Sequence, residues 1–524
     1  MKALKYTSLA IVAVMATVSC SQKALDEVNK DLNHPQDVTA NFIFADIPTS
    51  TAINITGGDY NTYFGVAIEH WGGAHGQMFS ADQRRAEWNS SSTFNNAWVT
   101  HYAILKNCLK VIEKCADDSG TVDAGDAGLR GMAEVMFAYN LAILTDLYGD
   151  VPYSEAFDYS KHMTPKVDSQ ESVYKEVMKY LENGIADLGS KTSVGAYDLL
   201  YGGDTGKWLK FAKGLKARLL LHTVLKASDP AAVYAEISSL CDESFSDRSE
   251  EAAFNAYNAT NYNPLFDFQW SRDDIGISQS LYDKFADRSD PRASLIYFDG
   301  GGWCHLVPGD AELDINPIPN GQGYEAQYYY SYDCFVFAQT ASTNLLSYHE
   351  VQFIKAEAEA RQGNDAAAKA AAQLAIEAAF ENTQASLDAA LAAPDIMAYG
   401  GLYYEDGDNG EGASLDAAIA DAYYTAVVDP LSGDDLLAEI MVQKYLAMYG
   451  ANGESVEAYN DIRRMKAAGE DFVTLDNPAN AAGKFPLRAG YGSSDTTANP
   501  NVKELFGTGA YVYTENVWWA GGTR

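Results

Sequence analysis

The side chains best suited to hold a ligand lie in residues 57–92, where aromatic rings are mixed with amides, carboxylates and a guanidinium group. An aromatic plane can pack against the C–H face of a sugar ring, while polar side chains nearby bond its hydroxyl groups. The candidate ligand contacts here are Tyr60, Tyr63, Trp71, Arg84 and Trp88. Alternatively, Trp71 and Trp88 fix these loops onto a hydrophobic core.

Two later segments offer further aromatic contacts. Trp303 follows three glycines and precedes His305 by two residues, and it is the sixth candidate contact. The tyrosines at 328–330 and 332 either line the same pocket or form a half-buried strand. Oligosaccharide binding is therefore the first hypothesis for these loops.

Motifs for catalysis or metal binding are missing from the sequence. It contains no GxSxG, no HExxH and no phosphate-binding glycine loop in the right context, and 72 acidic residues make paired carboxylates uninformative about a glycoside hydrolase. The spacing of Glu69, His70 and His75 fits no established metal-binding helix. Residues 405–411 are acidic but lack the alternation of a calcium loop, so a solvated loop is favoured over a calcium site. We expect no catalytic residues, metal or cofactor.

Composition excludes one class of partner. The 524-residue chain has a formal net charge of −35, which rules out a general nucleic-acid-binding protein because phosphate contacts need clustered Lys and Arg.

Cys108 and Cys115 are seven residues apart in a helical pattern, which places them about 10 Å from each other, so they should not form a disulfide. Whether Cys304 pairs with Cys334 stays open.

The N-terminus has the pattern of a bacterial lipoprotein signal. Lys2 and Lys5 precede a short apolar run at residues 9–18, which ends at Cys20 and is too short to span a membrane. We predict a signal peptide at residues 1–19, acylation of Cys20, and a flexible tether at residues 20–40 before the domain at 41–524. The alternative is an ordinary signal peptide with an incidental cysteine. Acidic residues arrive late after Cys20, so exposure at the cell surface is expected but not fixed by this stretch.

Helical signals dominate the rest of the chain. Apolar residues recur at three- and four-residue steps, and Asp168 or Ser169 is a suitable cap for a helix that follows. Residues 348–361 and 365–380 predict two helices joined at Gly363 and Asn364, a helical hairpin of about tetratricopeptide-repeat length. The other predicted helices cover residues 93–115, 129–147, 207–225, 436–449 and 456–466.

Long segments rich in Gly, Asn, Asp and aromatic residues separate these helices. Strand signals are short, as at residues 335–337, and the long segments are interpreted as loops that form a binding face. They cover residues 57–92, 255–277, 299–343 and 394–434.

Several short fragments form a recognisable series along the chain. They are YGDVPYSEA at 148–156, GGD and KWLKFA within 202–212, DPR at 290–292, EVQFIKAEA at 350–358, FPLR at 485–488 and WW at 518–519. In this order they resemble the fragments of the SusD/RagB family of outer-membrane nutrient-binding lipoproteins. Tyr459 stands where the family often has Trp, a change that concerns packing.

The resemblance implies a mostly α-helical single domain, in which tetratricopeptide-like helix pairs support long irregular ligand-binding loops with few short strands. It also implies a SusC-like TonB-dependent transporter as partner, an oligosaccharide as ligand, and attachment to the outer membrane through the N-terminal lipid. The family has no catalytic residues to carry over. Binding of oligopeptides by the same kind of complex is the alternative, and a glycoside hydrolase or a structural adaptor is a more distant one.

Overall fold

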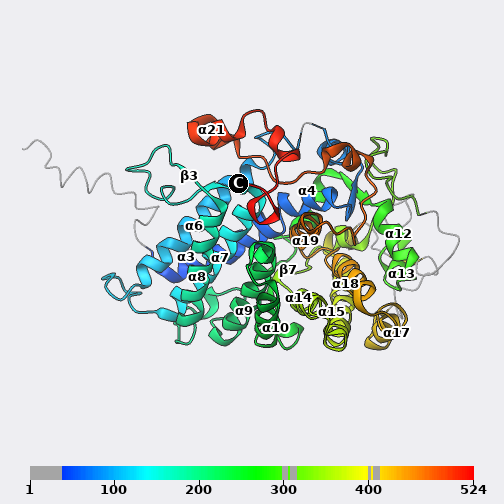
Figure 1. Ribbon diagram of the computed structural model, residues 1–524, viewed down its shortest axis with the longest axis horizontal. Coiled ribbons are helices and arrows are strands. Elements are labelled where there is room, and N and C mark those ends of the chain that lie inside the picture. Colours follow the sequence, from blue (N-terminus) through cyan, green and yellow to red (C-terminus); the bar gives the residue numbers. More distant parts are fainter. Residues whose placement is uncertain (1–37, 86, 298–304, 307–314, 399–402, 405–413) are drawn as a thin grey trace, which may run out of the picture.

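The computed structural model describes residues 38–85, 87–297, 305–306, 315–398, 403–404 and 414–524 (Figure 1). Cys20, Trp303, Cys304 and the acidic segment 405–411 lie outside the described residues. The described part is mostly helical, as the sequence predicts.

Several helices in the N-terminal half begin at side-chain caps that the sequence supplies. Ser169 accepts a hydrogen bond from the Ser172 amide at the start of α8, and Asp204 accepts two from the first turn of α9. The helices predicted at residues 93–115, 129–147 and 207–225 are confirmed within two residues at each end. The elements are α3 (Ala40–Ser50), the π-helix η1 (Thr51–Thr56), α4 (Asp59–Ala67), α5 (Gly76–Asp82), α6 (Asn95–Cys115), α7 (Ala127–Tyr148), α8 (Gln170–Asp187), η2 (Gly195–Tyr197), α9 (Thr205–Thr223), η3 (Val224–Lys226), α10 (Pro230–Asp242) and η4 (Arg248–Glu250).

The C-terminal half contains the predicted helical hairpin. Its first helix has the predicted bounds, whereas the second continues eleven residues beyond the predicted end, through residues 381–391, which contain no Gly or Pro that would end a helix. The elements are α11 (Pro264–Arg272), α12 (Gln279–Asp287), α13 (Ala293–Ile296), η5 (Cys334–Phe337), α14 (Tyr348–Arg361), α15 (Asp365–Leu391), α16 (Pro394–Ala398), α17 (Ala417–Val427), α18 (Gly433–Ala447), α19 (Ser455–Ala468), η6 (Asn480–Lys484), α20 (Ser493–Ala498), α21 (Pro500–Phe506), η7 (Ala510–Tyr513) and η8 (Trp518–Ala520).

Strands in the described residues form four two-stranded pairs. Three are antiparallel: β1 (Trp71–Gly73) with β5 (Ile275–Ile277), β2 (Val151–Pro152) with β3 (Val167–Asp168), and β4 (Ala252–Phe254) with β7 (Thr343–Leu346). The fourth is parallel, β6 (His305–Leu306) with β8 (Tyr403–Tyr404). The strand predicted at residues 335–337 is wrong, because the Asp333 carboxylate accepts hydrogen bonds from the Phe335 and Val336 amides and caps the 3₁₀ helix η5 there.

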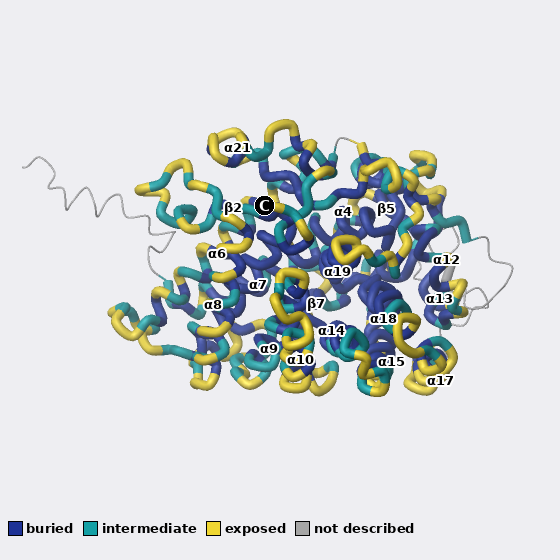
Figure 2. The backbone as a smooth tube through the Cα atoms, viewed as in Figure 1, coloured by how far each residue is buried: buried dark blue, intermediate teal, exposed yellow. Residues whose placement is uncertain are grey.

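The helices α9, α10, α14 and α15 lie side by side along the lower edge of the molecule in Figure 1, each packed against the next. Buried residues run through the centre, and exposed residues gather at helix ends and turns (Figure 2). Ion pairs lie within this core: Arg464 contacts Glu357 at 2.6 Å, and Lys444 contacts Asp461 at 2.6 Å. The helix pairs thus form a rigid support for the segments above them.

The segments predicted as loops are only partly irregular. Residues 57–92 contain α4 and α5, residues 255–277 contain α11, and residues 394–434 contain α16 and α17. Cys108 and Cys115 are buried free thiols, as predicted. Within the described ranges, no helix has both the length and the apolar character needed to cross a membrane.

Candidate ligand-binding site

The tryptophans predicted as ligand contacts in residues 57–92 lie in the core. Trp71 is fully buried, and its indole N–H donates to the Asp333 carboxylate at 3.1 Å. Trp88 is also fully buried and donates to the Ala81 carbonyl at 2.9 Å. Neither ring offers a free face to a ligand in this structure. Both tryptophans instead pack in the hydrophobic core, which is the alternative given for them above.

The other predicted contacts in this segment are buried as well. The Tyr60 hydroxyl hydrogen-bonds to that of Tyr148 at 3.0 Å, and the Arg84 guanidinium donates to the Ala67 carbonyl at 2.8 Å. Tyr63 is 5 % exposed, and burial together with the nearby Asp59 carboxylate raises the pKa of its hydroxyl. Asp59 lines a pocket, and Tyr63 is not among the residues that line it. The sixth predicted contact, Trp303, is outside the described residues.

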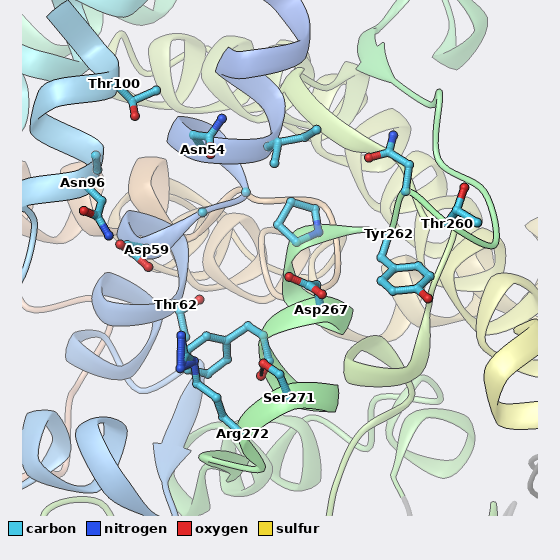
Figure 3. A pocket seen from close by; sticks show the side chains of 17 residues that line it. Asn54, Asp59, Thr62, Asn96, Thr100, Thr260, Tyr262, Asp267, Ser271 and Arg272 are labelled. Carbon is cyan, nitrogen blue, oxygen red and sulfur yellow. Dashed lines mark hydrogen bonds between the residues drawn. The ribbon is translucent and has the colours of Figure 1, made fainter.

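That pocket has a volume of about 630 Å³ and lies between two walls (Figure 3). One wall comes from η1, the start of α4 and the first turns of α6, and the other from residues 260–262 and α11. Thus two of the four segments interpreted as a binding face meet here. The side chains labelled in Figure 3 are Asn54, Asp59, Thr62, Asn96, Thr100, Thr260, Tyr262, Asp267, Ser271 and Arg272.

Both walls are fixed by local sequence. A Cβ atom at Gly58 would lie 2.5 Å from the Asn54 carbonyl oxygen, so glycine is needed where the chain turns between η1 and α4. On the opposite wall, Asn263 caps α11 by accepting a hydrogen bond from the Leu265 amide at 2.9 Å. The Asn263 side-chain amide also donates to the carbonyls of Ala341 and Ala451, which anchors α11 to the core.

Three charged side chains in the pocket have no hydrogen bond or ion pair within the described part of the chain: Asp59, Asp267 and Arg272. The Arg272 guanidinium lies over the Phe268 ring, 5.3 Å from its centroid. Burial raises the pKa of Asp59, and the positive charge of Arg272 offsets this in part. Asp267 and Arg272 are exposed, whereas Asp59 is partly buried. A partly buried carboxylate without a partner is unfavourable, so Asp59 is available to bond a ligand.

A tyrosine-rich loop adjoins the pocket at the end of α11. The Gln327 side-chain amide donates to the Arg272 carbonyl at 3.1 Å. Tyr328 and Tyr329 are 53 % and 56 % exposed, whereas Tyr330 is buried and its hydroxyl accepts a hydrogen bond from the Tyr324 amide. This loop, and not residues 57–92, carries the exposed aromatic rings near the pocket.

The sequence offered one signal for the pocket, which is that residues 57–92 and 255–277 were both unusually polar and aromatic. It offered none for the approach of Asp59 and Arg272 from opposite walls, because that depends on how α11 packs. Hydroxyl, amide and carboxylate groups beside the rings of Phe268 and Tyr262 suit a ligand rich in hydroxyl groups.

A family sequence model and a solved structure both relate the chain to the same protein family. The sequence model of the SusD-like family described as "Starch-binding associating with outer membrane" matches residues 33–491. A crystal structure of a SusD/RagB family protein from Bacteroides thetaiotaomicron is 41 % identical, covers 93 % of this chain and 100 % of its own, and superposes with a TM-score of 0.85. No curated protein matches the chain.

More distant structures share the fold. One described as a chitin-binding protein is 22 % identical, with a TM-score of 0.68, and the match covers 91 % of this chain and 99 % of that one. A chitin-binding SusD homologue from Flavobacterium johnsoniae is 17 % identical, with a TM-score of 0.64, covering 91 % and 98 %.

Proposed function

Because the chain belongs to the SusD-like family of starch-binding proteins that associate with the outer membrane, we propose that it captures an oligosaccharide and delivers it to a SusC-like TonB-dependent transporter. The observation that carries this proposal is the pocket between α4, α6 and α11 with its unpaired polar groups. The role is binding without chemistry, and no residue is assigned a catalytic part.

The pocket supports an oligosaccharide in two ways. Asn96, Asp59 and Asp267 offer donors and acceptors for hydroxyl groups, and the ring of Phe268 provides an apolar face. The exposed Tyr328 and Tyr329 next to the end of α11 extend this surface for a chain longer than the pocket. The chitin-binding descriptions of two structural relatives agree with a glycan ligand.

Attachment at the membrane rests on the N-terminal sequence. An acylated Cys20 followed by a polar tether would keep the protein beside its transporter while allowing it to move as a lid. Mass spectrometry of the mature N-terminus tests the acylation, and protease treatment of intact cells tests exposure at the cell surface. If the protein resists the protease on intact cells but is cut in lysed cells, it lies on the inner leaflet of the outer membrane.

Isothermal titration calorimetry with oligosaccharides of glucose, N-acetylglucosamine, glucosamine and uronic acid tests the ligand class, with oligopeptides as a second panel. We expect Phe268→Ala to weaken oligosaccharide binding roughly tenfold or more, since an apolar contact of this size contributes a few kcal/mol. The matched control is Phe42→Ala, an exposed ring on α3 outside the pocket, which should bind as the parent does.

Three results would overturn the proposal. Binding of peptides but not of any oligosaccharide would assign a different ligand. Equal binding by the parent and Phe268→Ala would show that the ligand lies elsewhere. Shortened products after incubation of the glycans with the purified protein would show an enzyme. Co-purification of a TonB-dependent barrel with the tagged lipoprotein tests the partner.

A further inference from the structure

The charges around the pocket do not balance. Asp59 and Asp267 contribute two carboxylates to the lining and Arg272 one guanidinium, so the lining is negative by one charge. Asp273 and Asp274 follow Arg272 directly. Burial raises the pKa of the Asp274 carboxyl, and the positive charge of the nearby Arg272 offsets this in part. Among the lining residues that the structure describes, Arg272 is the one cation, it lies near the carboxyls of Asp59 and Asp274, and the excess charge is negative.

A cationic ligand would stabilise the Asp59 carboxylate more than that of Asp267. Asp59 lies in the first turn of α4, where the adjacent cap residue is Gly58, which has no side chain. Its carboxylate has no hydrogen-bond or ion-pair partner among the described residues, although it is partly buried. A charge-assisted hydrogen bond from a ligand would compensate this desolvation.

We infer that the oligosaccharide bound in this pocket carries a protonated amino group, as a 2-amino sugar does, and that Asp59 and Asp267 select it. This inference rests on the proposed function and narrows its ligand class. An acidic sugar is disfavoured by the same groups, because its carboxylate would lie beside Asp59 and Asp267, and the positive charge of Arg272 already acts on Asp59 and Asp274. Neutral sugars retain the hydroxyl contacts but lack the charge-assisted bond.

The test compares four probes by calorimetry: oligomers of glucosamine, N-acetylglucosamine, glucose and galacturonic acid, all of one length. At a pH that keeps the amine protonated, we expect the glucosamine oligomer to bind about tenfold to a hundredfold more tightly than the two neutral oligomers. The galacturonic acid oligomer should bind more weakly than the neutral ones. Raising the salt concentration should reduce the preference.

Isosteric variants assign the effect to charge. Asp59→Asn and Asp267→Asn should each reduce binding of the glucosamine oligomer, with little change for the glucose oligomer. Arg272→Gln removes the positive charge from the pocket and is the matched control of opposite sign, so it should preserve or strengthen binding of the glucosamine oligomer. Circular dichroism of each variant verifies the fold.

The outcomes separate this inference from the proposed function. If neutral oligomers bind and Phe268→Ala weakens them, but the glucosamine oligomer is not preferred, the inference fails and the proposed function stands. A preference that persists in both aspartate variants, or an equal loss in Arg272→Gln, would also overturn the inference. If no oligosaccharide binds, both fail together.

Discussion

Asp82 should make the stability of the protein depend on pH near neutrality. Its carboxyl is fully buried at the end of α5, where it accepts a hydrogen bond from the Gly321 amide at 2.8 Å. Burial raises its pKa from 3.8 to about 7; the nearby Glu69 adds to the rise, whereas Arg84, the Gly321 amide and Asn477 oppose it. The perturbation that we propose is Asp82→Asn, which keeps an oxygen able to accept from Gly321.

The sign follows from the two protonation states. Between about pH 4 and pH 7 the unfolded chain has lost the Asp82 proton while the folded chain keeps it, so the free energy of unfolding falls as the pH rises. A rise of about three pKa units means that protonated Asp82 contributes about 4 kcal/mol to the free energy of unfolding. This contribution is fully lost above pH 7. From pH 5 to pH 8 the loss is about 3 kcal/mol. In Asp82→Asn the side chain does not titrate, so the free energy of unfolding does not fall for this reason.

Urea unfolding followed by tryptophan fluorescence at pH 5 and pH 8 measures the effect. The free energy of unfolding of Asp82→Asn minus that of the parent should increase by about 3 kcal/mol between the two pH values. Other buried carboxyls with raised pKa values, such as Glu134, are present in both proteins and cancel in the difference. The control is Asp118→Asn at an exposed position. A difference that is the same at pH 5 and pH 8 would refute the reasoning.

Three further substitutions test the core. Trp71→Ala should lower the free energy of unfolding by about 3–5 kcal/mol in urea, because it empties a buried site and leaves Asp333 without one donor; an effect near zero would contradict the observed packing. Gly73→Ala should cost about 1–3 kcal/mol by thermal unfolding, since its Cβ would lie 2.1 Å from the Met78 carbonyl oxygen. Glu357→Gln should cost about 3–5 kcal/mol in urea, because it leaves the buried Arg464 without its main counter-charge; unchanged stability would show that the pair is dispensable.

The helices could be predicted because their signals are local. Residues 348–361 carry a capping Ser347, acidic residues early in the helix and a following glycine, so the predicted and observed bounds coincide. The end of α15 was missed because residues 381–391 are mostly polar and lack the clear apolar stripe that marks a buried face. The strand predicted at residues 335–337 failed because a capping Asp333 overrode three residues with strong strand preference.

The candidate site lies in segments that the sequence singles out, but its lining residues could not be predicted. Whether Trp71 faces the core or the solvent depends on Asp333 and Tyr449, which are far away in the sequence. The pocket likewise needs Asp59 and Arg272 from segments that the sequence does not connect. Local aromatic content could locate the loops, whereas the direction of each ring depends on tertiary contacts.

Buried aromatic residues nevertheless determine the geometry of the pocket. Trp71 begins β1, which pairs with β5, and the Ala74 amide donates to the Asp274 carbonyl at 2.8 Å, two residues after Arg272. Residues 71–74 therefore fix the segment that follows α11, through the β1–β5 pairing and the hydrogen bond from Ala74 to Asp274. A loss of oligosaccharide binding in Trp71→Ala would follow from displacement of this wall and would not identify a ligand contact. The two roles are distinguished by stability, because a contact in the pocket such as Phe268 should change binding without the large loss of unfolding free energy expected for Trp71.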